Sequence, residues 1–413
     1  MITELSFHNW KSFERSTLKV DQLTFIIGTN AAGKSNIVDA LQFLSRVGSG
    51  ERLIEICKGI RGGADKIIRK GCAHAGLTVR IKTIPSDLKT ERTYDYHIAF
   101  SIGDKDAFIV QEKLTQDPDS RPKVLFETEE SSSQKLTNQI TAKFLKDKPG
   151  PRKGVNLRSD VPIICQVQGI NVLKEIKSTS QAILNALSSI FVLDPNPSAM
   201  RNFSALGDRL LADGSNVAGV LAAMDKENKQ KTESALTGYV KGLPEKDLRK
   251  IWAEPVGRFE DVAMLYCQEQ WDEDEAPHET DARSMSDGTL RFIAIITALL
   301  TMPSDSLLIV EEVDNGVHPS RASELVDAIE RIAGKGNFDV ICTTHNPVLI
   351  DVLPYDVLQS VCCVTREGAH GSSKIVRLTD RPDFTRQIAF HTPGQMMTDK
   401  GSVNADHSEH QAS

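Results

Sequence analysis

An eight-residue glycine-rich segment limits what this chain can fold into more than any other feature. It follows a short apolar run, residues 23–27, and precedes a segment whose apolar residues recur at helical spacing. A strand, a glycine loop and a helix in this order, with the pattern GxxxxGK followed by Ser or Thr, predict a phosphate-binding loop (P-loop). A glycine-rich turn that matches by chance is the alternative, and the elements on both sides argue against it. The residues are Gly28, Thr29, Asn30, Ala31, Ala32, Gly33, Lys34 and Ser35, with Asn36 next in the helix.

Each residue type in this loop suits phosphate chemistry. Gly28 and Gly33 allow a tight turn in which successive N–H groups point at phosphate oxygens. The start of the following helix adds the positive end of its dipole. Lys34 is expected to reach the β- and γ-phosphates, and the Ser35 hydroxyl to bind Mg²⁺. The loop therefore predicts binding of a nucleoside triphosphate.

A second group of polar residues follows two buried strands. Residues 307–310 form a continuous apolar run, typical of a strand buried in a parallel sheet, and Glu311 and Glu312 come directly after it. In a chain with a P-loop this pattern is a Walker B motif: the first acid orients Mg²⁺ and the second polarises the attacking water. His345 follows the next predicted strand, residues 338–344, where it can touch the γ-phosphate. A lone histidine is more often structural, but this position favours function.

A weaker signal lies between these groups, at Ser286, Asp287 and Gly288. Ser286 is expected to cap a helix whose buried face includes Leu290 and Ile293. The free N–H groups at that helix start would make a second anion site. A plain helix cap is the alternative interpretation of the same residues.

Size and composition exclude several classes of protein. A chain of 413 residues can hold two or three domains, or one large domain with an insertion. No apolar run approaches the roughly 18 residues of a membrane helix, and the N-terminus lacks the regions of a signal peptide. The seven cysteines include no Cys-x-x-Cys spacing. They indicate reduced thiols in a cytoplasmic protein without a zinc site.

Local charge departs from the overall balance in two stretches. The net charge is −7, yet residues 134–177 carry nine Lys or Arg against three acids, and residues 46–70 are also rich in cations. These stretches are the candidate DNA-facing surfaces. A solvated lysine-rich face is the commoner origin of such a run.

Together these motifs resemble those of the ABC-type ATPases of the RecF/SMC/OLD group, often described as AAA-type ATP-binding proteins. They occur in the family order: the 9–13 turn, the Walker A loop, the signature at 286–288, the Walker B strand, a D-loop at 315–319 and a switch at 344–347. Residues 213–221 are similar to a segment of the RecF-like members. The resemblance covers residues 2 to about 380, although only the motifs are specific.

The resemblance implies an α/β fold: a P-loop NTPase with an ABC-type head, in which helices flank a mixed central sheet. An α+β insertion would separate the Walker A loop from the signature. The expected divisions are 1–127 and 261–395 for the two parts of the head, 128–260 for an inserted, largely helical lobe, and 396–413 for a flexible tail.

The resemblance also implies Mg²⁺-dependent ATP hydrolysis. ATP would be sandwiched between two heads, with Lys34 and Ser35 of one facing the signature of the other, so that the protein is a homodimer or a higher oligomer. Glu311 would be the magnesium-associated acid, Glu312 the catalytic base and His345 the γ-phosphate sensor. A glutamine should complete the magnesium shell, and Gln166 and Gln168 are both candidates. The preference for ATP over GTP comes from the family alone.

Some features depart from the family pattern. Glu311 stands where aspartate is usual, and Asp287 replaces the first signature glycine, as in many RecF-like members. No long coiled coil or zinc hook is present, and the roughly 65 residues after His345 show no Toprim nuclease pattern. We therefore expect a switch that controls a separate effector, such as a defence nuclease or toxin. The alternative is a RecF-like DNA-repair clamp; a transporter subunit is disfavoured by the long insertion.

Overall fold

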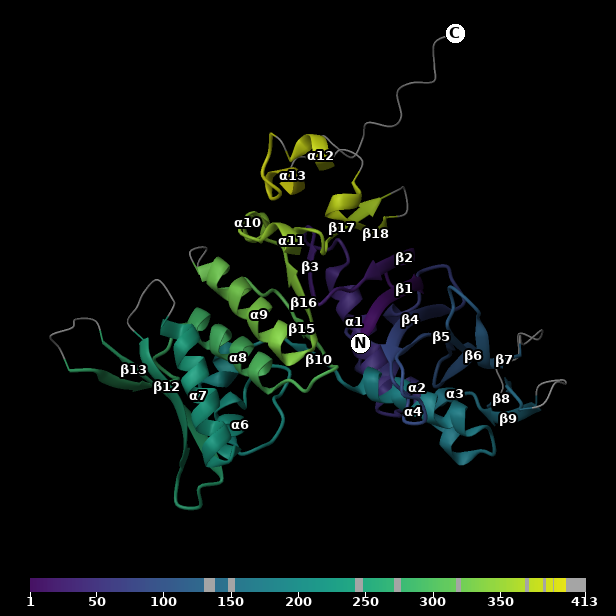
Figure 1. The fold of residues 1–413 in the computed structure, drawn as a ribbon, viewed down its shortest axis with the longest axis horizontal. Helices are drawn as coiled ribbons and strands as arrows, with labels where there is room; N and C mark the ends of the chain where they lie inside the picture. Colours follow the sequence, from purple (N-terminus) through teal and green to yellow (C-terminus); the bar gives the residue numbers. More distant parts are fainter. Residues whose placement is uncertain are drawn as a thin grey trace, which may run out of the picture.

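The computed structural model describes residues 1–129, 138–147, 153–241, 248–270, 276–316, 321–367, 371–381, 384–388 and 390–398. A central sheet lies between two lobes, an antiparallel sheet on one side and a smaller sheet with helices on the other (Figure 1). The C-terminal elements gather at one end of the central sheet. They are α10 (Pro347–Asp351), α11 (Tyr355–Leu358), η4 (Leu378–Asp380), α12 (Phe384–Gln387) and α13 (Gln395–Thr398).

The central sheet has six strands in the order β10-β15-β16-β3-β17-β18. Neighbouring strands from β10 to β17 pair in parallel, and β18 pairs with β17 in the antiparallel sense. Its strands are β3 (Leu23–Ile27), β10 (Ile190–Leu193), β15 (Leu307–Val310), β16 (Asp339–Thr344), β17 (Val361–Glu367) and β18 (Ser372–Arg377).

Both faces of this sheet are buried, which explains its continuous apolar strands. Because side chains alternate along a strand, Leu307 and Ile309 pack into one core while Leu308 and Val310 pack into the other. The first core joins the sheet to α1 (Lys34–Gly48), α2 (Leu53–Gly59), α4 (Lys174–Ser188) and the antiparallel lobe. The second joins it to α8 (Asp287–Thr301) and α9 (Ala322–Gly336).

The antiparallel lobe is an eight-stranded sheet in the order β2-β1-β4-β5-β6-β7-β8-β9. Its alternating sequence places one face against α1 and α4, with aromatic side chains such as Trp10, Phe43 and Phe100 in contact. The strands are β1 (Ile2–Trp10), β2 (Phe13–Lys19), β4 (Ala75–Thr83), β5 (Arg92–Ile102), β6 (Ala107–Gln116), β7 (Lys123–Thr128), β8 (Gln139–Phe144) and β9 (Lys153–Arg158); short helices are η1 (Ala64–Lys66), α3 (Ile163–Gln166) and η2 (Val167–Gly169).

The second lobe carries the signature helix α8. Its small sheet has the order β11-β13-β12, with β14 also paired to β13. α7 covers the outer edge of β12, where Thr237 and Glu233 accept hydrogen bonds from the N–H groups of Ile251 and Ala253. The elements are α5 (Pro197–Met200), β11 (Ser204–Ala205), α6 (Val217–Ala223), α7 (Lys226–Lys241), β12 (Leu248–Val256), β13 (Val262–Glu269) and β14 (His278–Asp281).

One expected division is wrong in its content. Residues 128–260 are not a largely helical lobe, because β8 and β9 extend the N-terminal sheet and β12 lies in the second lobe's sheet. Residues 130–137 and 148–152 lie outside the described residues. Most of the predicted tail, from residue 399 on, lies outside the described residues.

Candidate nucleotide site

The P-loop joins β3 to α1 and adopts a backbone that requires glycine at one position. Gly33 has a φ of 123°, and a Cβ built on it would approach the Ser373 hydroxyl oxygen to 2.6 Å. Ala31 also has a positive φ, 64°. No described side chain caps the start of α1. No side-chain oxygen therefore competes with an anion for the start of this 15-residue helix.

Lys34 is folded back onto this loop. Its ammonium donates to the carbonyl oxygens of Gly28 at 2.6 Å and Thr29 at 3.2 Å, and the residue is only 9% exposed. Burial lowers the pKa of Lys34, while the nearby carboxylates of Glu312 and Asp314 oppose that shift. Phosphate oxygens entering the loop would replace these carbonyls as partners of a cation that is already inside it.

The two residues after Lys34 differ in their surroundings. Ser35 is exposed at the first turn of α1, where its hydroxyl is free to face a metal ion. Asn36 instead braces the loop: its amide donates to the Ser12 hydroxyl at 2.7 Å, and its carbonyl accepts from the Trp10 indole at 2.8 Å. Asn36 thus links the predicted 9–13 turn to the P-loop, a supporting contact that motif spacing does not reveal.

Glu311 follows β15 and is buried in the structure. Its N–H donates to the Leu193 carbonyl at 2.9 Å, which aligns it with the end of β10. Its carboxylate accepts a hydrogen bond from the Arg61 guanidinium at 2.7 Å. Burial raises the pKa of Glu311, and the ion pair with Arg61 acts against that rise.

Glu312 adopts a strained backbone conformation that turns it out of the sheet. Its φ is 47°, in the left-handed region that a non-glycine residue rarely adopts. The Glu312 N–H donates to the Thr343 hydroxyl at 3.0 Å, and the Asn315 amide donates to the Glu312 carboxylate at 3.2 Å. These contacts fix an exposed carboxylate at the strand end, which is the placement a catalytic base needs.

His345 lies beside the P-loop because of strand register. Thr344, at the end of β16, is paired with Ile27, at the end of β3, so His345 and Gly28 leave the sheet side by side. The histidine is exposed. Asn346 caps α10 through its side-chain oxygen, which accepts from the Val348 N–H at 3.0 Å. The strand ends thus bring the P-loop, both acids and the histidine to one edge of the sheet.

The signature residues begin α8. The Ser286 hydroxyl accepts from the Thr289 N–H at 3.1 Å, so Ser286 is the expected N-cap. Arg201 holds Asp287 in an ion pair of 2.7 Å and also donates to the Met285 carbonyl. Ser286 and Asp287 are exposed. Across the described residues, no hydrogen bond or ion pair joins the signature to the P-loop of the same chain.

The D-loop is described in part. Asn315 and Gly316 are placed, and Gly316 lies against Gly288 of the signature. Residues 317–320, which include His318 and Pro319 of the predicted motif, lie outside the described residues.

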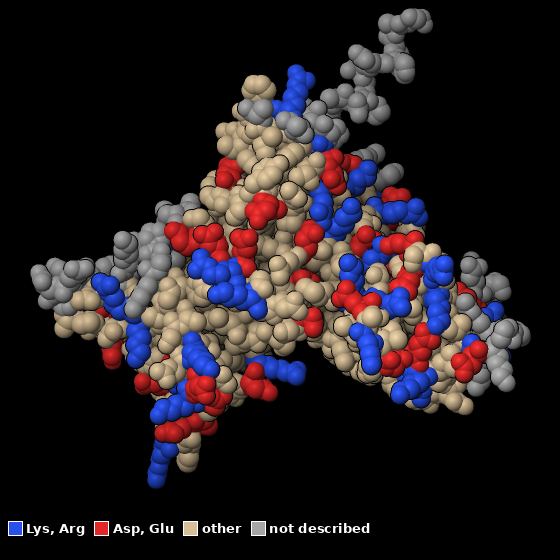
Figure 2. Space-filling model, viewed as in Figure 1, with Lys and Arg blue, Asp and Glu red and all other residues tan. Residues whose placement is uncertain are grey.

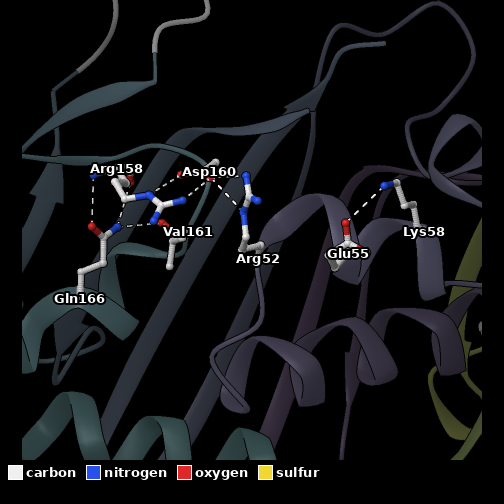
Figure 3. Close-up of polar contacts among 7 residues, drawn as sticks. All are labelled: Arg52, Glu55, Lys58, Arg158, Asp160, Val161 and Gln166. Carbon is white, nitrogen blue, oxygen red and sulfur yellow. Dashed lines mark hydrogen bonds and ion pairs between the residues drawn. The ribbon is translucent and has the colours of Figure 1, made fainter. Parts of the chain in front are cut away.

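The two candidate glutamines serve local turns. The Gln166 amide donates to the carbonyls of Arg158 and Val161, and its oxygen accepts from the Arg158 N–H (Figure 3). Gln168 exchanges hydrogen bonds with Lys177. Neither forms a described contact with the P-loop or with the acids after β15. The residue at the end of β10, beside Glu311, is Asp194, because Leu193 pairs with Val310.

The cations of the two basic stretches are mostly engaged within the chain. Arg52 and Arg158 both bind Asp160, and Lys58 pairs with Glu55 (Figure 3). In the face shown in Figure 2, blue and red side chains alternate over the antiparallel lobe without a continuous basic surface. Part of the 134–177 stretch lies outside the described residues.

Three acidic or basic residues of the site do not follow from the sequence motifs. Arg61 belongs to a basic run in the sequence, and the structure shows that it binds Glu311. Asp39 is a buried acid on the apolar face of α1, and that position is the signal that could have marked it. Asp314 is buried and one of its oxygens, Oδ1, has no hydrogen-bond partner. An orphaned buried oxygen of this kind fits a site that a cation or its water completes.

The donor set fits magnesium only with help from a nucleotide. Among the residues with described positions, no three His, Cys, Asp or Glu side chains gather closely enough to hold a metal ion. Mg²⁺ is commonly held by one or two protein oxygens together with phosphates and water. Ser35 and Glu311 could supply those protein oxygens, and the bound ion would neutralise charge on the phosphates.

Comparisons with known proteins bear on the class of ATPase. A family model described as "AAA domain, putative AbiEii toxin, Type IV TA system" matches residues 165–351, and one described as "P-loop containing region of AAA domain" matches residues 2–45. A search of curated proteins finds no match.

No helix among the described residues is long and apolar enough to cross a membrane.

The chain is also similar to solved SMC heads. One is an SMC head bound to the C-winged helix domain of ScpA, with a TM-score of 0.50 and 15% identity over 91% of this chain and 97% of that one. Others are the SMC head domain from Thermotoga maritima (TM-score 0.43, 13% identity, 91% and 98% covered) and a Pyrococcus furiosus head bound to the C-terminal domain of ScpA (0.47, 13%, 94% and 99%). The first likeness confirms the predicted fold, an ABC-type P-loop head, and the two family models support an AAA-type ATPase.

Proposed function

We propose that this protein is a cytoplasmic ATPase switch: two heads sandwich ATP and Mg²⁺, hydrolyse the ATP, and thereby control a separate effector protein, a nuclease or a toxin. The observation that carries the proposal is the convergence at one sheet edge of Lys34, Glu312 and His345, from three different strand ends. A phosphate cradle, a base and a polar sensor at one edge are the parts that phosphoryl transfer to water requires.

Each residue has a distinct role in the proposed hydrolysis. The P-loop and Lys34 bind and orient the phosphates. Glu312 accepts the proton of the attacking water, and the Thr343 and Asn315 contacts keep its carboxylate in position. Glu311 and Ser35 hold the metal, and His345 contacts the terminal phosphate.

The two-headed arrangement is supported by the position of the signature. Ser286 and Asp287 are exposed, and no described contact turns them toward their own P-loop. An exposed helix start in this fold is available to a nucleotide bound by a second head. A solved SMC head of the same fold is bound to a domain of another protein, which supports a protein partner for this chain as well.

The test is purification of the Glu312→Gln protein from its native host in the presence of ATP, followed by identification of what it retains. We expect a stoichiometric protein partner that is absent when ATP is omitted. Nucleic acid retained alone and released by salt would instead support the DNA-repair clamp. A bare monomer would contradict the sandwich model.

A further inference from the structure

Glu311, the first acid after β15, is paired with a cation of the chain itself. Arg61, in the segment between α2 and η1, donates from Nη2 to the Glu311 carboxylate at 2.7 Å, and 250 residues separate the two in sequence. We propose that Arg61 is a latch that holds Glu311 until Mg²⁺ with nucleotide takes its place. This inference rests on the proposed function, since it assumes that Glu311 serves the metal.

The latch is anchored on the opposite side by α1. The Arg61 Nε lies 3.3 Å from Asp39, whose side chain is 1% exposed. Lys11 also binds Asp39, at 2.5 Å, and donates to the Arg61 carbonyl at 2.7 Å. Arg61 therefore bridges two acids from different elements. Lys11 hydrogen-bonds the backbone carbonyl of Arg61 and balances the negative charge of Asp39.

The charges around Glu311 favour a bound cation. Asp194 stands beside Glu311, because β10 and β15 run in register. With Asp39, three carboxylates surround one guanidinium, and the Glu311 side chain is only 10% exposed. Without Arg61, Glu311 would be a buried anion among like charges, and its affinity for any other cation would increase.

Arg61 can leave without disrupting the core. Its side chain is 52% exposed, in contrast to 8% for Lys11. The next two residues, Gly62 and Gly63, have φ values of 88° and 73°, and a Cβ on Gly63 would meet nothing within 4 Å. Because Gly63 lies in open space, the end of this segment can adjust once the ion pair opens, while the Lys11 bond to the Arg61 carbonyl holds its start. Metal binding at Glu311 would then change the conformation of the segment that precedes η1.

The experiment measures binding of a fluorescent ATP analogue as Mg²⁺ is titrated, for wild type, Arg61→Ala and Lys58→Ala. Lys58 is the matched control, because it is a nearby cation in an exposed pair with Glu55. We expect Arg61→Ala to lower the half-saturating Mg²⁺ concentration by about three- to tenfold, the effect of losing one competing hydrogen bond from a half-exposed cation. Lys58→Ala should match wild type.

The same binding measured in EDTA distinguishes a latch on Glu311 from an arginine that binds phosphate. Nucleotide affinity in EDTA should be the same for Arg61→Ala and Lys58→Ala; a selective loss in Arg61→Ala would mean that the arginine binds phosphate, which overturns the latch. An unchanged or higher Mg²⁺ requirement would also overturn it. Arg61→Lys should give an intermediate Mg²⁺ requirement, which guards against a fold defect in the alanine variant. If wild type bound no nucleotide at all, the proposed function itself would fail.

Discussion

Gly288 of the signature lies directly against Gly316 of the D-loop, so closely that a Cβ on Gly288 would approach the Gly316 carbonyl oxygen to 2.3 Å. The two glycines flank β15 in the sequence: Gly288 lies at the start of α8, and Gly316 lies in the segment after Glu312. Within one head, the residues proposed to face a second head are therefore joined to the segment that carries the catalytic base.

This contact predicts that Gly288→Ala separates binding from hydrolysis. The added methyl group must displace the Gly316 backbone, while the P-loop is untouched. We expect normal nucleotide affinity and an ATPase rate reduced at least about tenfold, the effect of a small misplacement at a site. Gly334→Ala in α9 is the control, because a Cβ there meets nothing within 4 Å. Equal ATPase rates for the two variants would refute the coupling.

Lys34→Ala should abolish nucleotide binding, because the ammonium is the only P-loop side chain placed to neutralise phosphate among those described. A ligand at about a hundred times its Kd stabilises the native state by about 2.7 kcal/mol. Mg²⁺ with ATP should therefore raise the thermal midpoint of wild type by a few degrees and leave the variant unchanged. The exposed Lys66 provides a control, and Lys66→Ala should respond as wild type does.

Glu312→Gln should keep ATP bound and stabilise the closed dimer. Glutamine preserves the shape of the side chain and the Asn315 contact but cannot accept a proton from water. Light scattering after size exclusion should show an ATP-dependent dimer that persists, with hydrolysis reduced by about 10²-fold or more. Hydrolysis at the wild-type rate would show that another residue is the base.

Glu112 predicts a pH dependence that comes from the antiparallel lobe rather than the site. This fully buried carboxylate accepts from the N–H groups of Ile163 and Ile164, and burial raises its pKa to about 7. Its folded-state pKa lies above the unfolded value, so protonation of Glu112 favours the folded protein. This contribution to the free energy of unfolding is complete below about pH 4.5 and is lost as the pH rises through about 7. The difference amounts to about 3 kcal/mol.

The measurement is the thermal midpoint of wild type and Glu112→Gln at pH 5.5 and pH 8. Glutamine cannot titrate, so the midpoint of the variant should fall less between these pH values than that of wild type. Parallel declines in the two proteins would show that Glu112 does not change protonation over this range.

The sequence could propose a nucleotide site, and the elements that position it, because its motifs are local. The β3–P-loop–α1 unit and the β15 acids are each defined by adjacent residues, and only the parallel pairing of β16 was needed to bring His345 to them. The helix cap at Ser286 likewise follows from a few neighbouring residues.

What the sequence did not reveal is which segments come into contact. The Arg61–Glu311 pair spans 250 residues, so no spacing rule marks it. Gln166 lies on an apolar run, yet the run belongs to α3 and the glutamine serves the turn after β9. Strands β8 and β9 carry part of the predicted basic insertion, but they pair with each other and with β7, and so extend the antiparallel sheet.

The most direct test of the two-headed site is complementation between two inactive variants. Lys34→Ala has a defective P-loop and an intact signature, whereas Ser286→Arg has the reverse. If each site joins the P-loop of one head to the signature of another, a mixed dimer keeps one complete site. Random pairing makes about half the dimers mixed, so an equal mixture should recover about a quarter of the wild-type ATPase rate. A mixture no more active than its separate components would contradict an ATP site shared between two heads.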